Sequence, residues 1–271
     1  MPAIVELARA KINLSLHVLG RRVDGYHELS SVVAFADIAD RLVIAPAEHN
    51  VLFVSGPFAS DVPLGDDNII WKAWAHVRAL MPVPCVAVQL EKNLPVASGI
   101  GGGSADAAAM LRGLLRLADV QLDHVQISGL AAIGADVPVC FVGQACLMEG
   151  IGEKISVLTE QLPPALVLVN PLVPCATAAV FKVMGLKLGD TRPAPARAEW
   201  RNDMTAAAIQ TQPVISNVLS ALQKTALFPV LMSGSGATCF GIARSFKDAQ
   251  LLAAEIAALQ PQWWVKPARL G

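Results

Sequence analysis

The segment 94–109, which reads LPVASGIGGGSADAAA, constrains the fold of this chain more than any other. It places Gly99, Gly101, Gly102 and Gly103 directly before a strongly helical run. Glycine lets the backbone adopt positive φ values and approach a ligand closely. The N-terminus of the following helix offers unpaired N–H groups and the positive end of the helix dipole. The segment therefore predicts a phosphate-binding turn. The plainer alternative is a turn that only lets a core helix pack closely.

A helix is predicted from Ser104 onward. Its buried face follows the i, i+3 and i+4 spacing and consists of Ala107, Leu111, Leu114, Leu115 and Ala118. Ser104 is expected to cap the helix, and Asp106 to lie in its first turn. A carboxylate there would repel a polyphosphate unless Asp106 points away from the phosphate site.

The loop does not match the best-known nucleotide motifs. No Lys follows its glycines, so the pattern GxxxxGK[ST] is absent. Ser104 stands where the dinucleotide fingerprint GxGxxG needs its third Gly. The protein-kinase motifs HRD, DFG and VAIK are missing as well. The glycines therefore belong to another nucleotide or phosphate architecture.

The composition favours a globular enzyme. Of 271 residues, 54% are apolar and 16% are charged, which suits well-buried sheets and helices. The longest weakly charged stretches, 127–147 and 226–243, are broken by Gly, Pro or Ser, so neither predicts a membrane-spanning helix. Glu6, Arg9 and Lys11 interrupt the N-terminal apolar run, which is untypical of a signal peptide.

The net charge and the cysteine pattern exclude several classes of binding partner and site. A net charge of −1, with no basic cluster beyond the pair Arg21-Arg22, argues against a nucleic-acid surface. The five cysteines are scattered and never show CxxC spacing, which indicates reduced thiols and neither disulfides nor a zinc site. We therefore expect a cytoplasmic enzyme that acts on a small molecule, without a membrane or nucleic-acid partner.

Strict alternation predicts a half-buried strand over 8–18. Its apolar face consists of Ala8, Ala10, Ile12, Leu14, Leu16 and Val18, and its polar face of Arg9, Lys11, Asn13, Ser15 and His17. Lys11 and Asn13 are then neighbours on one face, roughly 7 Å apart at Cα. Asp24-Gly25 turns the chain into a second strand over 26–35, so the opening is a hairpin.

The remaining elements predict an α+β chain with two domains, 1–158 and 159–271. In the first domain we expect strands over 40–55, 84–91 and 137–142, helices over 68–80 and near 123–134, and a hairpin over 145–158. In the second we expect strands over 165–169, 228–233, 237–243 and 262–266, and helices over 203–224 and 245–259. Residues 188–201 are expected to form an exposed loop. The strand–helix–strand–strand–helix–strand order predicts a ferredoxin-like second domain.

Lys11 and Asp136 are candidates for chemistry, because phosphoryl transfer needs charge around the phosphate and a group that takes the acceptor's proton. The position of Lys11 alone favours an ordinary solvated lysine. Asp136 is a lone carboxylate in AIGADVPVCF, where Pro138 is expected to make the chain turn or extend. Its alternative role is that of a turn or capping residue. The turn SGSGA at 233–237 either closes over the site or simply joins two strands.

Four segments in chain order resemble one family. They are AKINL at 10–14 with RVDGYHEL at 22–29, the glycine loop at 95–106, GADVP at 134–138 and LMSGSGAT at 231–238. Together they resemble the 4-diphosphocytidyl-2-C-methyl-D-erythritol kinase family of the GHMP small-molecule kinase superfamily. The Gly-Tyr-His at 25–27 distinguishes this family from other GHMP kinases.

The resemblance implies the two-domain GHMP kinase fold, with a ribosomal-protein-like N-terminal α/β domain and a ferredoxin-like C-terminal domain. It implies ATP-dependent phosphorylation of the 2-hydroxyl of 4-diphosphocytidyl-2-C-methyl-D-erythritol, in the non-mevalonate route to isoprenoid precursors. ATP would be the co-substrate and Mg²⁺ its counter-ion, and the acceptor would be a small molecule with a cytidine diphosphate moiety. We expect a monomer or weak homodimer.

The resemblance also implies roles for single residues. Asp136 would accept the proton of the 2-hydroxyl, while Lys11 would lower the pKa of that hydroxyl and stabilise the transferring phosphoryl group. Asn13 would hold the substrate near Lys11. Tyr26 and Phe181 would stack on the two faces of the cytosine, and His27 would hydrogen-bond its edge. The alternative for Phe181 is plain core packing.

ATP would bind along the glycine loop. The implied residues are Pro95, Val96, Ala97, Ser98, Gly99, Ile100, Gly101, Gly102, Gly103, Ser104 and Ala105. Asn68 and Lys92 would flank the adenosine, and Ser104 would help to hold Mg²⁺. This chain departs from many relatives at Ala97, where Gly is common, and at Ala105, where a hydroxyl residue is common; Ala105 removes one phosphate donor.

Three other functions compete. A GHMP kinase for another alcohol, such as homoserine or mevalonate, has no use for the Tyr26-His27 pair. A non-catalytic sensor of ATP and a metabolite has no need of both Lys11 and Asp136. A nucleic-acid-binding module would follow from the ribosomal-protein-like fold, but the chain lacks a basic surface.

Overall fold

The computed structural model describes residues 3–193 and 199–271 and shows an α+β chain that forms two compact units. The first unit consists of segments 1–10, 38–96 and 101–143, and the second of segments 11–37, 97–100 and 144–271. Strands β1 (Ile4–Asn13) and β3 (His27–Pro46) each run through both units. The units therefore alternate along the chain, and the domain boundary at 158/159 stays a prediction.

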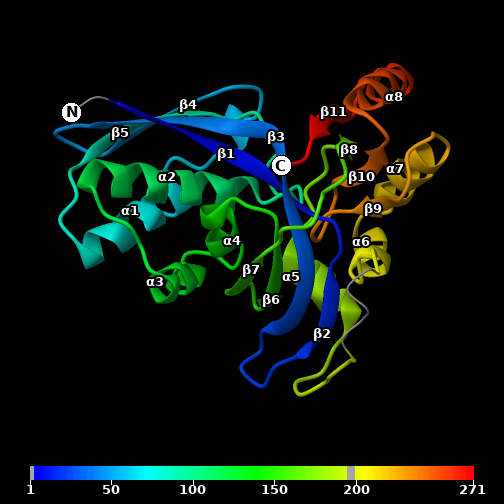
Figure 1. The fold of residues 1–271 in the computed structure, drawn as a ribbon, viewed down its shortest axis with the longest axis horizontal. Helices are drawn as coiled ribbons and strands as arrows, with labels where there is room; N and C mark the ends of the chain where they lie inside the picture. Colours follow the sequence, from blue (N-terminus) through cyan, green and yellow to red (C-terminus); the bar gives the residue numbers. More distant parts are fainter. Residues whose placement is uncertain (1–2, 194–198) are drawn as a thin grey trace. The chain divides into compact units, whose positions relative to one another are not determined.

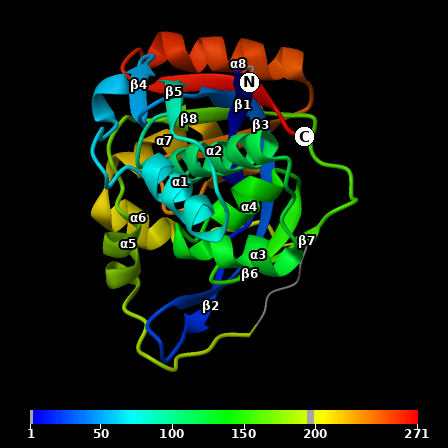
Figure 2. The same cartoon turned by 90° about the vertical axis from the view of Figure 1, so that its left-hand side faces the viewer.

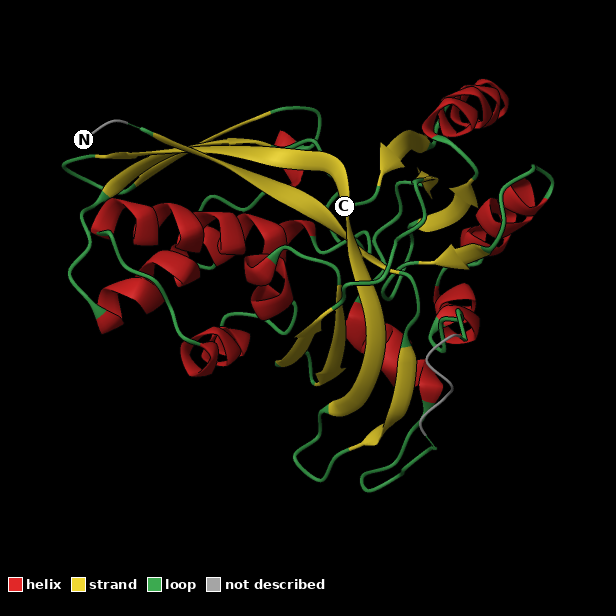
Figure 3. Cartoon of the chain, viewed as in Figure 1, coloured by secondary structure: helices red, strands yellow, loops and turns green. Residues whose placement is uncertain are grey.

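The first unit combines strands with a layer of helices (Figures 1 and 3). Besides its parts of β1 and β3 it contains β4 (Val51–Ser55), β5 (Val86–Glu91), α1 (Ile69–Leu80), α2 (Gly102–Ala118), α3 (His124–Gly129), α4 (Val137–Val142) and two 3-10 turns, Ala59–Asp61 and Leu130–Ala132. β5 pairs antiparallel with β3 and parallel with β4. The strand predicted over 40–55 is thus two strands, the end of β3 and β4.

Helix α2 packs closely against the strands of the first unit. A side-chain carbon at Gly113 would lie 2.4 Å from Cδ1 of Ile44 on β3, so a larger residue at this position of the helix would require the Ile44 side chain to shift. Leu111 and Leu114 of the same helix are fully buried. The amphipathic helix predicted after the glycine loop is confirmed.

The strand predicted over 137–142 is wrong, because these residues form α4. Pro138 does not exclude the helix, since it lies in the first turn, where a backbone N–H has no intrahelical partner to lose. Asp136 is the residue that precedes the first helical residue.

The second unit holds its parts of β1 and β3 and the following elements. They are β2 (His17–Arg21), β6 (Cys146–Gly150), β7 (Lys154–Val157), β8 (Ala165–Asn170), α5 (Thr177–Met184), α6 (Thr205–Thr211), α7 (Val214–Gln223), β9 (Val230–Met232), β10 (Cys239–Ala243), α8 (Phe246–Leu259) and β11 (Trp264–Arg269). β2 and β6 both pair antiparallel with β3, and β6 pairs with β7, so the hairpins predicted at 8–35 and 145–158 are present.

The second sheet of this unit confirms the ferredoxin-like prediction. Its strand order is β11-β8-β10-β9, all antiparallel, which is the 4-1-3-2 order of that fold. Helices α7 and α8 pack against its strands (Figure 2). Helix α5 was not predicted, and the helix expected over 203–224 is divided at Gln212-Pro213 into α6 and α7.

The predicted strand over 8–18 is interrupted. β1 ends at Asn13, and Leu16 pairs with Asn202 before β2 begins. Its polar face is not solvated, because Lys11, Asn13, Ser15 and His17 are all buried.

Of the exposed loop predicted over 188–201, residues 194–198 lie outside the described residues; the remainder forms no helix or extended strand, and Leu188 is exposed. No helix in the described part of the chain is long and apolar enough to cross a membrane.

Candidate active site

The tip of the glycine-rich loop, residues 97–100, turns its carbonyl groups into the second unit. Each carbonyl oxygen accepts one hydrogen bond: Ala97 from the N–H of Cys175 (3.2 Å), Ser98 from Thr238 (3.0 Å), Gly99 from Ser233 Oγ (3.0 Å) and Ile100 from Lys11 (2.9 Å). In residues 3–193 and 199–271, no acceptor meets the backbone N–H groups of Gly99, Ile100 or Gly101. The carbonyl oxygens at the loop tip are thus bonded within the protein, whereas these three N–H groups are available to a ligand.

Glycine is required where this loop meets the turn at 233–237. Gly99 has a φ of 79°, and a side-chain carbon on it would lie 2.5 Å from the carbonyl oxygen of Ser233. A side-chain carbon on Gly234 would lie 2.6 Å from the carbonyl oxygen of Gly99. The two turns therefore touch backbone to backbone, and the 233–237 turn does more than join β9 to β10.

The start of α2 differs from the prediction. Gly101, with a φ of 66°, is the capping residue, and Ser104 lies inside the first turn. Ser104 therefore does not cap the helix. A side-chain carbon on Gly134 would lie 3.8 Å from Ser104 Oγ, so the first turn of α2 lies beside the turn that leads to Asp136.

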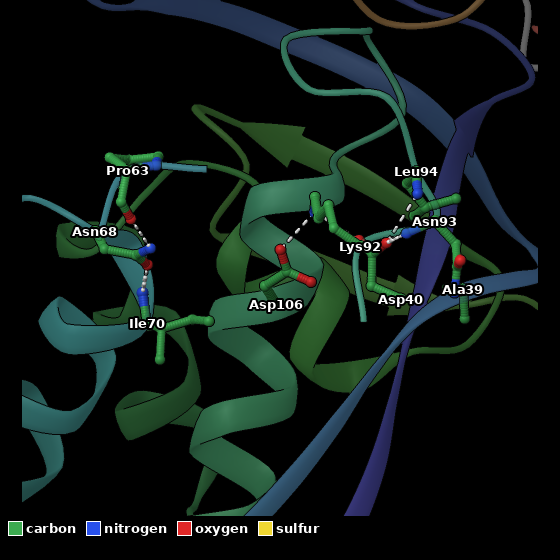
Figure 4. A network of polar contacts seen from close by, with 9 residues as sticks. All are labelled: Ala39, Asp40, Pro63, Asn68, Ile70, Lys92, Asn93, Leu94 and Asp106. Atoms are coloured by element: carbon green, nitrogen blue, oxygen red, sulfur yellow. Dashed lines mark hydrogen bonds and ion pairs between the residues drawn. The ribbon is translucent and has the colours of Figure 1, made fainter. Parts of the chain in front are cut away.

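The stem of the glycine-rich loop, residues 92–94 and 102–106, surrounds a buried ion triad (Figure 4). Lys92 Nζ lies 2.5 Å from Oδ2 of Asp40 on β3 and 2.5 Å from Oδ2 of Asp106 on α2. The other oxygen of Asp40 accepts the N–H groups of Asn93 (2.6 Å) and Leu94 (2.8 Å). One lysine thus ties both ends of the loop to β3.

Burial raises the pKa of Asp106 to about 8, with Lys92 opposing this rise and Asp40 adding to it. The carboxyl group lies in the triad, which resolves the repulsion expected between Asp106 and a polyphosphate. Lys92 was predicted to flank the adenosine, but its ammonium is already paired inside the first unit. The only signal for this pairing in the sequence, a lysine directly after a strand, is too weak to reveal it.

Asn68 is likewise engaged. Its side chain caps α1 by accepting the N–H of Ile70 (2.8 Å), and it donates to the carbonyl of Pro63 (2.5 Å), as Figure 4 shows. Its predicted contact with adenosine stays a prediction.

Lys11 and Asp136 belong to different units, Lys11 to the second and Asp136 to the first. The side chain of Lys11 is 3% exposed, so the interpretation as a solvated lysine is wrong. Burial raises the pKa of the Cys146 thiol to about 11, and the charge of Lys11 opposes this rise. Lys11 is therefore a buried cation of the second unit.

Asn13 takes part in a neutral hydrogen-bond chain in the second unit. Its Nδ2 donates to Ser31 Oγ (2.7 Å), and that hydroxyl donates to the carbonyl of Ser15 (2.5 Å). Its Oδ1 is buried and has no hydrogen-bond partner among the described residues. An unpaired buried acceptor of this kind costs free energy and calls for a ligand donor.

Two of the three residues predicted to bind cytosine are in contact with each other. His27 and Phe181 are stacked on each other, with ring centroids 3.8 Å apart and planes 6° apart, while Tyr26 is 57% exposed. His27 Nε2 is buried and without a partner among the described residues. Burial, together with the charge of Arg21, lowers the pKa of His27 and so favours the neutral form of the ring.

Sequence reasoning missed Ser31, Thr238 and the carboxylate of Asp40. Asn202 was also missed; its Nδ2 donates to the carbonyls of Met232 and Gly234, both at 2.8 Å, and so fixes the 233–237 turn. Only the SGSG turn itself carried a signal in sequence.

Comparison with known proteins gives consistent similarities. The family model "GHMP kinases N terminal domain" matches residues 68–144, and "GHMP kinases C terminal" matches residues 192–262. The 4-diphosphocytidyl-2-C-methyl-D-erythritol kinase of Paramagnetospirillum magneticum (strain ATCC 700264 / AMB-1) is 47% identical over 278 residues, which cover 97% of each chain.

Solved structures agree. A crystal structure of 4-(cytidine 5'-diphospho)-2C-methyl-D-erythritol kinase matches with a TM-score of 0.80 and 31% identity over 99% of each chain. A homoserine kinase from Cytophaga hutchinsonii matches with a TM-score of 0.67 but only 13% identity, covering 99% of this chain and 95% of its own, and shares the fold alone.

Proposed function

The chain belongs to the 4-diphosphocytidyl-2-C-methyl-D-erythritol kinase family of GHMP kinases, and from this premise we propose how its residues carry out the reaction. The enzyme transfers the γ-phosphoryl group of ATP to the 2-hydroxyl of 4-diphosphocytidyl-2-C-methyl-D-erythritol. The reaction serves isoprenoid precursor synthesis by the non-mevalonate route. Membership of this family favours this activity over that of a homoserine or mevalonate kinase and over that of a non-catalytic sensor.

The observation that carries the proposal is the orientation of the glycine-rich loop. All four carbonyl oxygens of 97–100 are bonded inside the second unit, whereas the N–H groups of Gly99, Ile100 and Gly101 meet no acceptor in the described part of the chain. Unpaired N–H groups before a helix N-terminus bind phosphate oxygens. ATP phosphates are the ligand that this loop would take, along the segment 95–105.

Lys11 and Asp136 would perform the transfer. Asp136 accepts the proton of the attacking 2-hydroxyl, and Lys11 stabilises the negative charge on the transferring phosphoryl group. Each of these roles is typically worth about 10²- to 10⁴-fold in rate. The burial of Lys11 supports its role, because a cation away from water acts on nearby charge more strongly.

The cytidine moiety would bind at Tyr26, His27 and Phe181. A neutral His27 with an unpaired Nε2 suits recognition of a pyrimidine edge. Because His27 stacks on one face of Phe181, a cytosine between Tyr26 and Phe181 would use the other face of Phe181 or take the place of His27.

Mg²⁺ would enter with ATP. No group of three or more His, Cys, Asp or Glu side chains suited to a metal occurs in the described ranges, so a free-standing metal site does not fit. A cation carried by phosphate oxygens and water, with the Ser104 hydroxyl as a protein donor, does fit. When bound, Mg²⁺ neutralises phosphate charge. A cytoplasmic location and a monomer or weak homodimer remain part of the proposal.

A coupled ADP-release assay tests the function. It uses ATP, Mg²⁺ and the cytidyl substrate, with homoserine and mevalonate in parallel. Turnover confined to the cytidyl substrate supports the proposal. Turnover on another alcohol would retain the kinase and reject the cytidine site, and binding without turnover would indicate a sensor.

Asp136→Asn tests the base. We expect ATP and substrate to bind almost as before while kcat falls by about 10²-fold or more. Unchanged kcat would contradict the assignment.

Tyr26→Ala tests the cytidine site. It should raise KM for the cytidyl substrate and leave KM for ATP nearly unchanged. An equal loss for both substrates would indicate misfolding.

A further inference from the structure

The side chain of Asn13 is oriented by a chain of three groups on β1, β3 and the residues between β1 and β2. Asn13 Nδ2 lies 2.7 Å from Ser31 Oγ, which lies 2.5 Å from the carbonyl oxygen of Ser15. All three residues are buried, with Asn13 1% and Ser31 0% exposed. The backbone N–H of Val32 also binds this region, donating to Ser15 Oγ (3.1 Å). The chain is therefore held from both strands.

The direction of each hydrogen bond follows from the number of protons. A backbone carbonyl only accepts, so Ser31 must donate its single hydroxyl proton to Ser15. Ser31 Oγ then has only lone pairs left, and the Asn13 atom that faces it must be a donor, the amide nitrogen. The opposite orientation would place two acceptors against each other in a buried site, which is unfavourable.

We propose that Ser31 is a positioning residue, which holds the Asn13 amide so that Oδ1, an acceptor, is presented to the substrate. The inference rests on the proposed function, in which Asn13 contacts the substrate beside Lys11. Asn13 and Lys11 are two residues apart on β1 and share a face of that strand. Oδ1 is buried without a partner in the described part of the chain, so only an incoming group satisfies it.

The orientation selects the chemistry of the bound group. Oδ1 takes a hydroxyl or amine hydrogen and rejects a carbonyl, ether or phosphate oxygen. A polyol whose free hydroxyl is next to the reacting one fits this requirement, and an analogue that lacks the hydroxyl leaves the buried oxygen unpaired. Ser31 would thus contribute to selectivity without touching the substrate.

A double-mutant cycle tests the proposal. Asn13→Ala, Ser31→Ala and the double variant are compared by kcat/KM for the cytidyl substrate and by KM for ATP. We expect a loss of about 10-fold for Asn13→Ala and about 3- to 10-fold for Ser31→Ala, as for one neutral hydrogen bond. The double variant should be no worse than Asn13→Ala, because Ser31 acts only through Asn13. KM for ATP should stay within twofold.

Ser30→Ala is the matched control, since Ser30 precedes Ser31 on β3 and faces the opposite side of the strand. If Ser31→Ala fails to fold, Ser31→Cys replaces it, because a thiol is similar in size but a weak hydrogen-bond partner. A Ser31 loss of equal size in the Asn13→Ala background would overturn the proposal, as would a Ser31 variant with unchanged kcat/KM. An unchanged kcat/KM in Asn13→Ala would instead reject the substrate contact in the proposed function.

Discussion

The glycine-rich loop is held by two anchorages of different chemistry. Its stem is fixed in the first unit by three buried ionisable side chains, Lys92, Asp40 and Asp106. Its tip is fixed in the second unit by neutral hydrogen bonds to four backbone carbonyls. At the stem, one ammonium group between two carboxyl groups supplies most of the stabilising free energy. At the tip, the stabilising free energy is shared among four separate hydrogen bonds. Substitutions in the stem should therefore cost much more than substitutions at the tip.

The largest effect is expected from Lys92→Met. Removal of the cation leaves two buried carboxyl groups without their partner, and breaking a buried ion pair costs about 3–5 kcal/mol. Chemical denaturation measures the loss in the free energy of unfolding. Lys72→Met on the exposed side of α1 serves as the control and should be nearly neutral. Equal stability of the two variants would remove the contrast between stem and tip.

The second effect depends on pH and concerns Asp106. The pKa of this carboxyl group is raised to about 8 in the folded chain, so the folded state holds a proton that the unfolded state releases above its ordinary pKa. The contribution of Asp106 to the free energy of unfolding should therefore fall as the pH rises from the ordinary carboxyl pKa towards 8, by roughly 1 kcal/mol per pH unit.

Asp106→Asn should remove this slope, because an amide does not titrate. Unfolding is followed without nucleotide between pH 6 and 9 for both proteins. Parallel curves for the wild type and the variant would contradict the assignment of the slope to Asp106.

At the tip, Ser233→Ala should cost about 1–2 kcal/mol. The variant leaves the buried carbonyl of Gly99 and the N–H of Asn13 without their shared partner, but it removes no charge. Thermal unfolding gives the comparison with Ser220→Ala, an exposed serine of α7. A loss as large as that of Lys92→Met would mean that the stability of the tip depends on a single group as much as that of the stem does.

The smallest effect should be a gain. Ala97 has a φ of 50°, a left-handed conformation that costs a side chain about 1 kcal/mol. Ala97→Gly should stabilise the chain by about 0.5 kcal/mol, after the greater flexibility of unfolded glycine is subtracted. Ala105→Gly, inside α2, should instead destabilise by about 1 kcal/mol. The same sign for both variants would contradict the strain at Ala97.

The sequence predicted the features that depend on local pattern. The amphipathic helix α2 and the strand order of the ferredoxin-like sheet were confirmed, since both follow from spacing and turn residues. It failed where a pattern has two physical outcomes. Pro138 fits the first turn of a helix as well as an extended chain, and residues 137–142 form a helix. The short helix α5 was not predicted at all.

The candidate site was less accessible to sequence reasoning. The alternation around Lys11 indicated a polar face, but not that this face is buried, because burial depends on segments far away in the chain. Lys92 was interpreted as a ligand contact, and its carboxylate partners lie 52 and 14 residues away. The bonds to the loop tip use mostly backbone groups, which every residue has and no sequence pattern reveals.

The alternation of the two units along the chain limits how the gene can be divided, in evolution and in protein engineering. The chain passes from one unit to the other between residues 10 and 11, 37 and 38, 96 and 97, 100 and 101, and 143 and 144. No single cut in the gene yields an intact unit, so neither can be exchanged as a cassette or expressed as a simple truncation. Two of these passages enclose the four residues of the loop tip. Recombination that exchanges a whole unit therefore needs a crossover at each of these five positions.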